Sequence, residues 1–227
     1  MMTKEYKEME NQKFVISEED FFDFFRCTIE NIENDYKKNG VKIQDIYKDN
    51  AKWTQTILDY IECGREICIR SSESKGCEKN PRGIKEKYKN YGLKTEREYY
   101  RIDLIAYDVD KVKCKEKLGL NWHVWNLQLA FEHENNSKDW TDEVTKLAHI
   151  KCGLRVVVGY SEDPSKNQEK LDFCSKMLDK LAYGKPNDDD RWLIILGICG
   201  QKSYSNLKDY YTGYEWDSEQ KKFVPLS

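Results

Sequence analysis

Apolar residues recur at helical spacing in the first third of the chain. Ser17, followed by three acidic residues, has the pattern of a helix start, with a hydroxyl cap and acids in the first turn. The apolar residues that follow at helical intervals are Phe21, Phe22, Phe25, Ile29, Ile32 and Tyr36. We expect this helix to end at Gly40 and a second helix to cover Ala51 to Cys68.

From residue 98 the pattern changes to that of a sheet. The predicted strands cover residues 99–107, 122–131, 154–160 and 191–199, and the predicted helices between them cover 140–151 and 168–183. The last two strands are nearly continuous apolar runs, as expected for strands buried on both faces. Strand and helix alternate there as they do in parallel crossovers, and a terminal hairpin is predicted around Asp217 to Gln220.

These elements predict an α/β protein with a single mixed β-sheet flanked by helices on both sides. The chain has 227 residues, enough for one sizeable domain. Within that domain we expect a helical part over residues 1–69 that packs on the core and a loop over 70–94. Residues 95–227 would then form the α/β core with its C-terminal hairpin.

The segment 70–94 differs from the rest of the chain in charge. It holds eight basic and three acidic residues, a balance of +5 in a protein of net charge −3. A solvated surface loop is the ordinary interpretation, and contact with the phosphates of a nucleic acid is the functional one. The negative net charge counts modestly against a nucleic-acid-binding protein, although it leaves a local basic face open.

Two further features indicate where the protein works. The N-terminal residues are polar and lack the apolar stretch of a signal peptide, and the longest apolar run, Trp192 to Cys199, is too short to cross a bilayer. We therefore expect a cytoplasmic protein with no membrane partner, in which most of the eight cysteines are reduced thiols.

Three acids carry the chemical signal. Asp103 lies inside an otherwise apolar strand, where a carboxylate is costly unless it is paired, hydrogen-bonded or bound to a cation. Glu132 and Glu134 follow the next strand at a spacing of two, which puts them on one face. A divalent cation would remove the repulsion within such a cluster, and oxygen ligands suit Mg²⁺ or Mn²⁺.

The order of these residues resembles that of a known enzyme family. Asp103 lies on a strand, Glu132-His133-Glu134 follows the next strand, and a helix and a buried strand come after. Over roughly residues 95–200 this order resembles the PD-(D/E)XK, or restriction-endonuclease-like, nucleases. The resemblance implies that Asp103, Glu132 and the backbone carbonyl of His133 bind the metal. Two positions depart from the family pattern. Ile102 precedes Asp103 where proline is usual, and Glu134 occupies the position of a lysine that helps to activate water.

The missing lysine leaves alternatives open. By the resemblance, Glu134 itself acts as base or extra ligand, or Lys146 supplies the amine from the following helix; the ordinary interpretation of Lys146 is an i,i+4 ion pair with Asp142. A glutamate from the second helix, Glu62 or Glu66, is a weaker addition to the site.

The leading hypothesis is a Mg²⁺- or Mn²⁺-dependent endonuclease that hydrolyses phosphodiester bonds in DNA, or less favourably RNA, in restriction or phage defence. One alternative is a nuclease-like module that binds nucleic acid or protein without cleaving. Another is a different α/β fold with an acidic pocket for a small molecule. Many such nucleases form homodimers, and no feature of this sequence indicates one.

Overall fold

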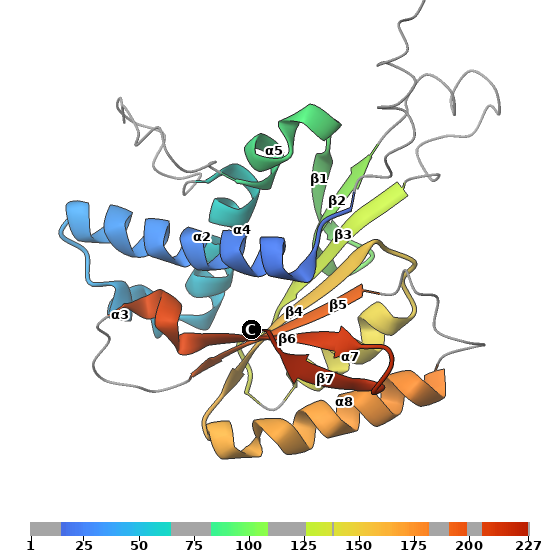
Figure 1. Ribbon diagram of the computed structural model, residues 1–227. Helices are drawn as coiled ribbons and strands as arrows, with labels where there is room; N and C mark the ends of the chain where they lie inside the picture. The colour runs from blue at the N-terminus through green and yellow to red at the C-terminus, as the bar shows by residue number, and fades with distance from the viewer. Residues whose placement is uncertain are drawn as a thin grey trace, which may run out of the picture.

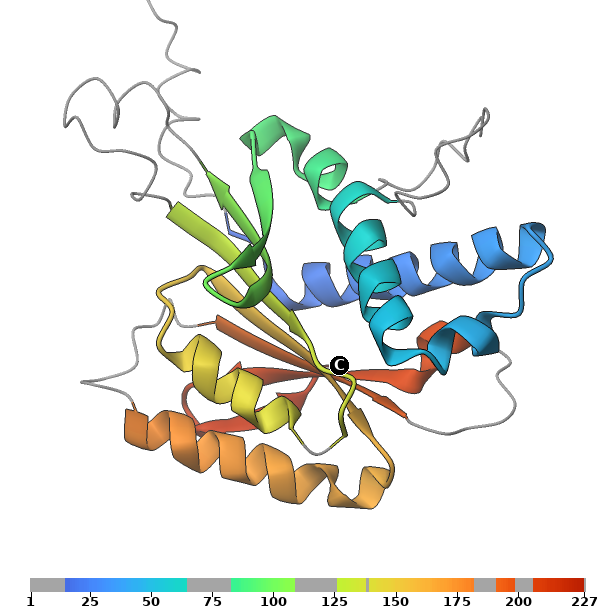
Figure 2. The same cartoon turned by 180° about the vertical axis from the view of Figure 1, so that it is seen from behind.

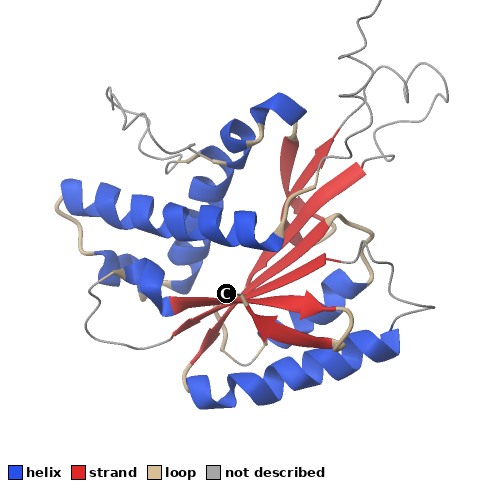
Figure 3. Cartoon of the chain, viewed as in Figure 1, coloured by secondary structure: helices blue, strands red, loops and turns tan. Residues whose placement is uncertain are grey.

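A seven-stranded mixed sheet with helices on both faces forms the centre of the protein (Figures 1 and 3). The computed structural model describes residues 15–64, 83–108, 126–137, 139–181, 191–198 and 206–226. The predicted fold class, a single mixed sheet flanked by helices, is therefore confirmed.

The strands lie in the sheet in the order in which they occur in the chain. They are β1 (Lys94–Tyr99), β2 (Ile102–Asp108), β3 (Asn126–His133), β4 (Leu154–Ser161), β5 (Arg191–Ile198), β6 (Tyr211–Asp217) and β7 (Lys222–Pro225). The central pairs β3–β4 and β4–β5 are parallel, and the outer pairs are antiparallel. The predicted crossovers and the terminal hairpin are both present, the latter as β6 and β7.

One face of the sheet carries the N-terminal helices. They are α2 (Glu18–Lys38), α3 (Ile43–Tyr47), α4 (Asn50–Cys63) and α5 (Ile84–Lys87), with the short 3-10 helices η1 (Lys89–Tyr91) and η3 (Leu207–Tyr210) nearby. Helix α2 begins as predicted, because Ser17 accepts a hydrogen bond from the Asp20 N–H at 3.1 Å. The predicted second helix ends earlier than expected, at Gly64, which has a φ of 70°.

The other face carries α7 (Trp140–Ala148) and α8 (Asn167–Leu181), which follows the 3-10 helix η2 (Pro164–Lys166); the view from behind shows both (Figure 2). Alternation along the strands explains the two layers, because successive side chains point to opposite faces. On β3, Phe131 belongs to the apolar cluster beneath α2 and α4, whereas Ala130 belongs to the cluster beneath α7 and α8.

The strand predicted over 99–107 is instead the second half of a hairpin. Residues 94–99 form β1, which reaches into the segment predicted as a basic loop, and a turn at Tyr100 and Arg101 leads into β2. Neither turn residue is a glycine or asparagine, so the sequence carries no ordinary hairpin signal there. Strand β3 also extends to His133, which places Glu132 inside the sheet rather than at its end.

Other predictions fall partly outside the described residues. Residues 70–82 of the basic segment lie outside them, as does Glu66. Two described lysines of that segment make ion pairs within the protein, Lys85 with Glu62 and Lys87 with Asp20.

The four described cysteines, at 27, 63, 152 and 174, are free thiols. No helix in the described ranges is long and apolar enough to cross a membrane.

Candidate active site

Strand pairing brings two of the predicted acids together. Leu104 of β2 pairs with Phe131 of β3, so one step further along the antiparallel ladder places Asp103 opposite Glu132. A hydrogen bond of 2.8 Å from the backbone N–H of His133 to Oδ2 of Asp103 fixes this arrangement. By alternation, both side chains point to the face covered by α7.

Helix α7 adds the lysine. Nζ of Lys146 lies 2.6 Å from Oε1 of Glu132, contacts Oε2 of Glu143 one helical turn earlier, and donates a hydrogen bond of 2.8 Å to the carbonyl of Arg101. Lys146 forms ion pairs with Glu132 and Glu143 rather than the i,i+4 ion pair with Asp142 that was the ordinary interpretation. The lysine therefore reaches the acidic site from the helix that follows β3.

Close packing holds α7 over the site at both ends. At the start of the helix, the ring of Trp140 lies on Gly159 of β4, where a Cβ would come within 2.5 Å of the ring. At its end, Nε of the buried Arg155 donates to the carbonyls of Leu147 and Ile150 at 3.1 and 2.9 Å. A cation at a helix C-terminus satisfies carbonyls that have no partner within the helix.

Three carboxylates share one ammonium in this cluster. Glu132 is 2% exposed, and its burial, together with the charge of Asp103, raises its pKa well above the usual range despite Lys146. Burial also raises the pKa of Asp103, against the opposing effects of the His133 N–H and Lys146. Burial lowers the pKa of Lys146, but its bonds to Glu132 and Glu143 outweigh this, and the net shift is upward. Lys146 is therefore a cation at neutral pH, in a site where three carboxyl groups surround one ammonium.

Glu134 lies just beyond β3 and is used differently. Its backbone N–H donates to the carbonyl of Val158 at 2.9 Å, and its Oε1 accepts a hydrogen bond of 2.6 Å from the backbone N–H of Asn136. Asp103, Glu132 and Lys146 therefore lie together in the structure. The Glu134 carboxylate instead forms a hydrogen bond within the turn that follows the strand.

The ring of His133 points to the opposite face, as its place in the strand predicts. Its Nδ1 lies 3.0 Å from the hydroxyl of Thr54, and its Nε2 lies 2.9 Å from the hydroxyl of Tyr160. Burial lowers the pKa of this histidine to about 3, so the ring is neutral. Only the backbone of His133 is available to the acidic site.

The carboxylates of Asp103 and Glu132 are compatible with a Mg²⁺-type site that uses few protein ligands. Within the described residues, no group of three or more histidine, cysteine or acidic side chains is arranged to hold a metal ion. Two neighbouring carboxylates that repel each other are nevertheless sufficient for Mg²⁺, which is commonly held by one or two carboxylates, water and substrate phosphates. Asp103 and Glu132 are therefore the residues that could hold a hard divalent cation, and its remaining ligands would have to come from water and substrate.

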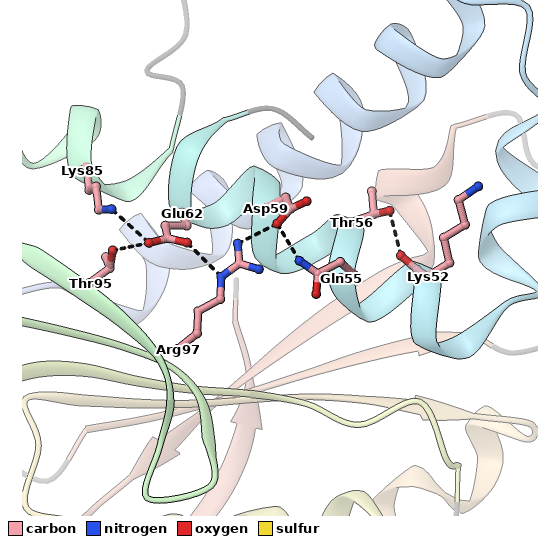
Figure 4. A network of polar contacts seen from close by, with 8 residues as sticks. All are labelled: Lys52, Gln55, Thr56, Asp59, Glu62, Lys85, Thr95 and Arg97. Carbon is pink, nitrogen blue, oxygen red and sulfur yellow. Dashed lines mark hydrogen bonds and ion pairs between the residues drawn. The ribbon is translucent and has the colours of Figure 1, made fainter. Parts of the chain in front are cut away.

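A second charged cluster lies on the opposite face of the hairpin (Figure 4). Arg97 of β1 donates to Asp59 and Glu62 of α4, both at 2.8 Å. Glu62 also accepts hydrogen bonds from Thr95 at 2.6 Å and Lys85 at 3.0 Å. The helix glutamate considered as an addition to the active site thus ties α4 to β1 and α5 instead.

Sequence reasoning missed Glu143. A glutamate on an amphipathic helix is ordinarily solvated, so the residue drew no notice. The available signal was its place next to the buried stripe of α7, formed by Trp140, Val144 and Leu147.

A scan of protein-family models finds no match for the chain, and searches of curated proteins and solved structures find none either.

Proposed function

We propose that this protein is a Mg²⁺- or Mn²⁺-dependent nuclease that hydrolyses phosphodiester bonds in DNA or RNA. The observation that carries the proposal is the contact of Lys146 with Glu132, beside Asp103 on the adjacent strand. A lysine amine next to these two acids is the feature that distinguishes an enzyme from an inactive relative within the PD-(D/E)XK resemblance. A cytoplasmic location, and a homodimer able to cut both strands, belong to the same proposal.

Each residue has a distinct role in this proposal. Asp103 and Glu132, with the carbonyl of His133, would hold the cation, and the chemistry that it would supply there is polarisation of the phosphate and a lowered pKa for the attacking water. Lys146 stays protonated, so it acts as a positive charge beside the phosphate rather than as a base. Glu143 keeps the lysine in place, and Glu134, which contacts the turn, has no assigned step.

One observation favours the alternative of a binding module without catalysis. Glu132 already has a cationic partner, the third acid of the cluster, Glu143, contacts Lys146, and within the described residues no group of three such side chains is arranged to hold a metal ion. A protein that binds nucleic acid through this face without cutting it would still have the same fold. Cleavage and binding must therefore be measured separately.

The test is cleavage of supercoiled plasmid and of a labelled single strand with Mg²⁺, Mn²⁺ or EDTA. Lys146→Met should lose about 100-fold or more in rate, the usual scale for removing one charge-stabilising donor, whereas Lys176→Met, at an exposed lysine of α8, should cleave normally. Metal-dependent cleavage that survives Lys146→Met would refute the assigned role. If the wild-type protein binds nucleic acid but never cuts it, the binding module is correct.

A further inference from the structure

The turn between β1 and β2 is unusual for its sequence. Tyr99 pairs with Ile102, which leaves Tyr100 and Arg101 as a two-residue turn with φ values of 49° and 65°. Hairpin turns with positive φ at both positions favour Asn-Gly, because side chains with a bulky Cβ are strained there. Glu98, with a φ of 54°, precedes them. Three of the four positive-φ residues other than glycine in the described segments thus lie in one hairpin.

This strained turn is adjacent to the active site. The carbonyl of Arg101 accepts the hydrogen bond from Nζ of Lys146 at 2.8 Å, and Asp103 follows two residues later. The register of β1 and β2 puts Glu98 opposite Asp103, and the charge of Glu98 acts on that carboxyl. Strained backbone that persists beside reactive groups is a reason to look for a function of the residues that bear it.

The two side chains at the tip are available for binding. Tyr100 is 72% exposed, the highest value among the large apolar and aromatic side chains in the described ranges, and its ring stands edge-on to Tyr99 with centroids 4.6 Å apart. Arg101 is exposed, and its guanidinium makes no ion pair or hydrogen bond with any described residue. An exposed aromatic ring beside a guanidinium with no partner suits a base and its phosphate.

We propose that Tyr100 and Arg101 bind an unpaired nucleotide next to the bond that is cut. The ring of Tyr100 stacks on the base and Arg101 pairs with the phosphate, so the site prefers single-stranded or frayed nucleic acid to a continuous duplex, whose bases are already stacked. This inference rests on the proposed function and adds a substrate class to it. The cost of the strained turn is retained because Asn-Gly, which would relieve it, offers neither group.

The test is binding measured by fluorescence anisotropy, with Ca²⁺ present, on a labelled dT20 strand and a 20-bp duplex. Tyr100→Ala should weaken binding to the single strand about 10-fold, the scale of one lost base–aromatic stack, while Tyr100→Phe should bind normally. Arg101→Ala should weaken binding and reduce the salt dependence by about one phosphate contact. Phe173→Ala, which removes an aromatic ring that is 58% exposed on α8, is the matched control and should have no effect.

A second measurement separates binding from folding. The double variant Tyr100→Asn, Arg101→Gly should have a higher thermal midpoint and weaker binding to the single strand, because it relieves the strain and removes both contacts. If Tyr100→Ala and Arg101→Ala bind dT20 as wild type does, or if the duplex binds more tightly than the strand, the inference is wrong and the nuclease proposal stands. If wild type binds neither probe, both fail.

Discussion

The two charged clusters on β1 and β2 lie on opposite faces of the same hairpin and differ in charge balance. On the α4 face, the acids Asp59 and Glu62 meet the cations Arg97 and Lys85. On the α7 face, Asp103 and two glutamates share a single lysine. The first cluster is matched in charge, and the second has an excess of acid.

The pKa values of the glutamates reflect this difference. Burial by itself would raise the pKa of Glu62, but hydrogen bonds from Thr95 and Lys85 and the charges of Lys85 and Arg97 give a net shift downward. The pKa of Glu132 is raised, first by burial and then by Asp103, and Lys146 does not compensate. The matched cluster joins helix α4 to strand β1 with balanced charges, whereas the unmatched cluster has fewer cations than acids and is where we propose that a divalent cation binds.

Breaking the matched cluster should cause a greater loss of stability than any other change considered for the two clusters. Arg97→Met leaves the buried Asp59 carboxylate and Glu62 without their shared partner, and we expect the free energy of unfolding to fall by about 3–5 kcal/mol. Urea denaturation measures this change. Lys38→Met removes a lysine whose side chain is 73% exposed from an ion pair on α2 and should change stability by less than about 0.5 kcal/mol. Equal effects from the two variants would mean that the Arg97 cluster is not structural.

Replacing glutamate by glutamine should affect stability differently in the two clusters. Glu62→Gln should reduce the free energy of unfolding by about 1–3 kcal/mol at pH 7, since it weakens hydrogen bonds made to a charged group. Glu132→Gln replaces a buried carboxyl whose raised pKa favours its neutral form, so it should leave stability unchanged or raise it by about 1 kcal/mol, while abolishing metal-dependent cleavage. A destabilised Glu132→Gln variant would show that both clusters serve the fold.

The smallest effect is a pH dependence. The folded-state pKa of Glu62 lies below its ordinary value of 4.5, so between these two values the unfolded chain binds more protons. The stabilisation by Glu62 is therefore complete above the unfolded pKa and is lost as the pH falls through the folded pKa. The difference in the free energy of unfolding between wild type and Glu62→Gln should be greatest at neutral pH and should disappear in acid. A difference independent of pH would contradict the charged pairing.

Much of this architecture could be predicted from the chain, because long periodic segments carry their own signal. The acids in the first turn of α2 and the apolar runs of β4 and β5 are examples. The β1–β2 turn could not be predicted, since Tyr100 and Arg101 have no local preference for positive φ and are held there by the strands on either side. The burial of Glu132 and the route of Lys146 depend on α7 packing over β3, a contact between segments that no local pattern encodes.

Calorimetric titration with Mn²⁺ tests, without any substrate, our proposal that Asp103 and Glu132 bind a divalent cation. We expect wild type to bind Mn²⁺, the Asp103→Ala variant to lose that binding, and Asp142→Ala, at an exposed acid of α7, to keep it. No binding by wild type at millimolar Mn²⁺, or undiminished binding by Asp103→Ala, would show that these two acids do not form a cation site.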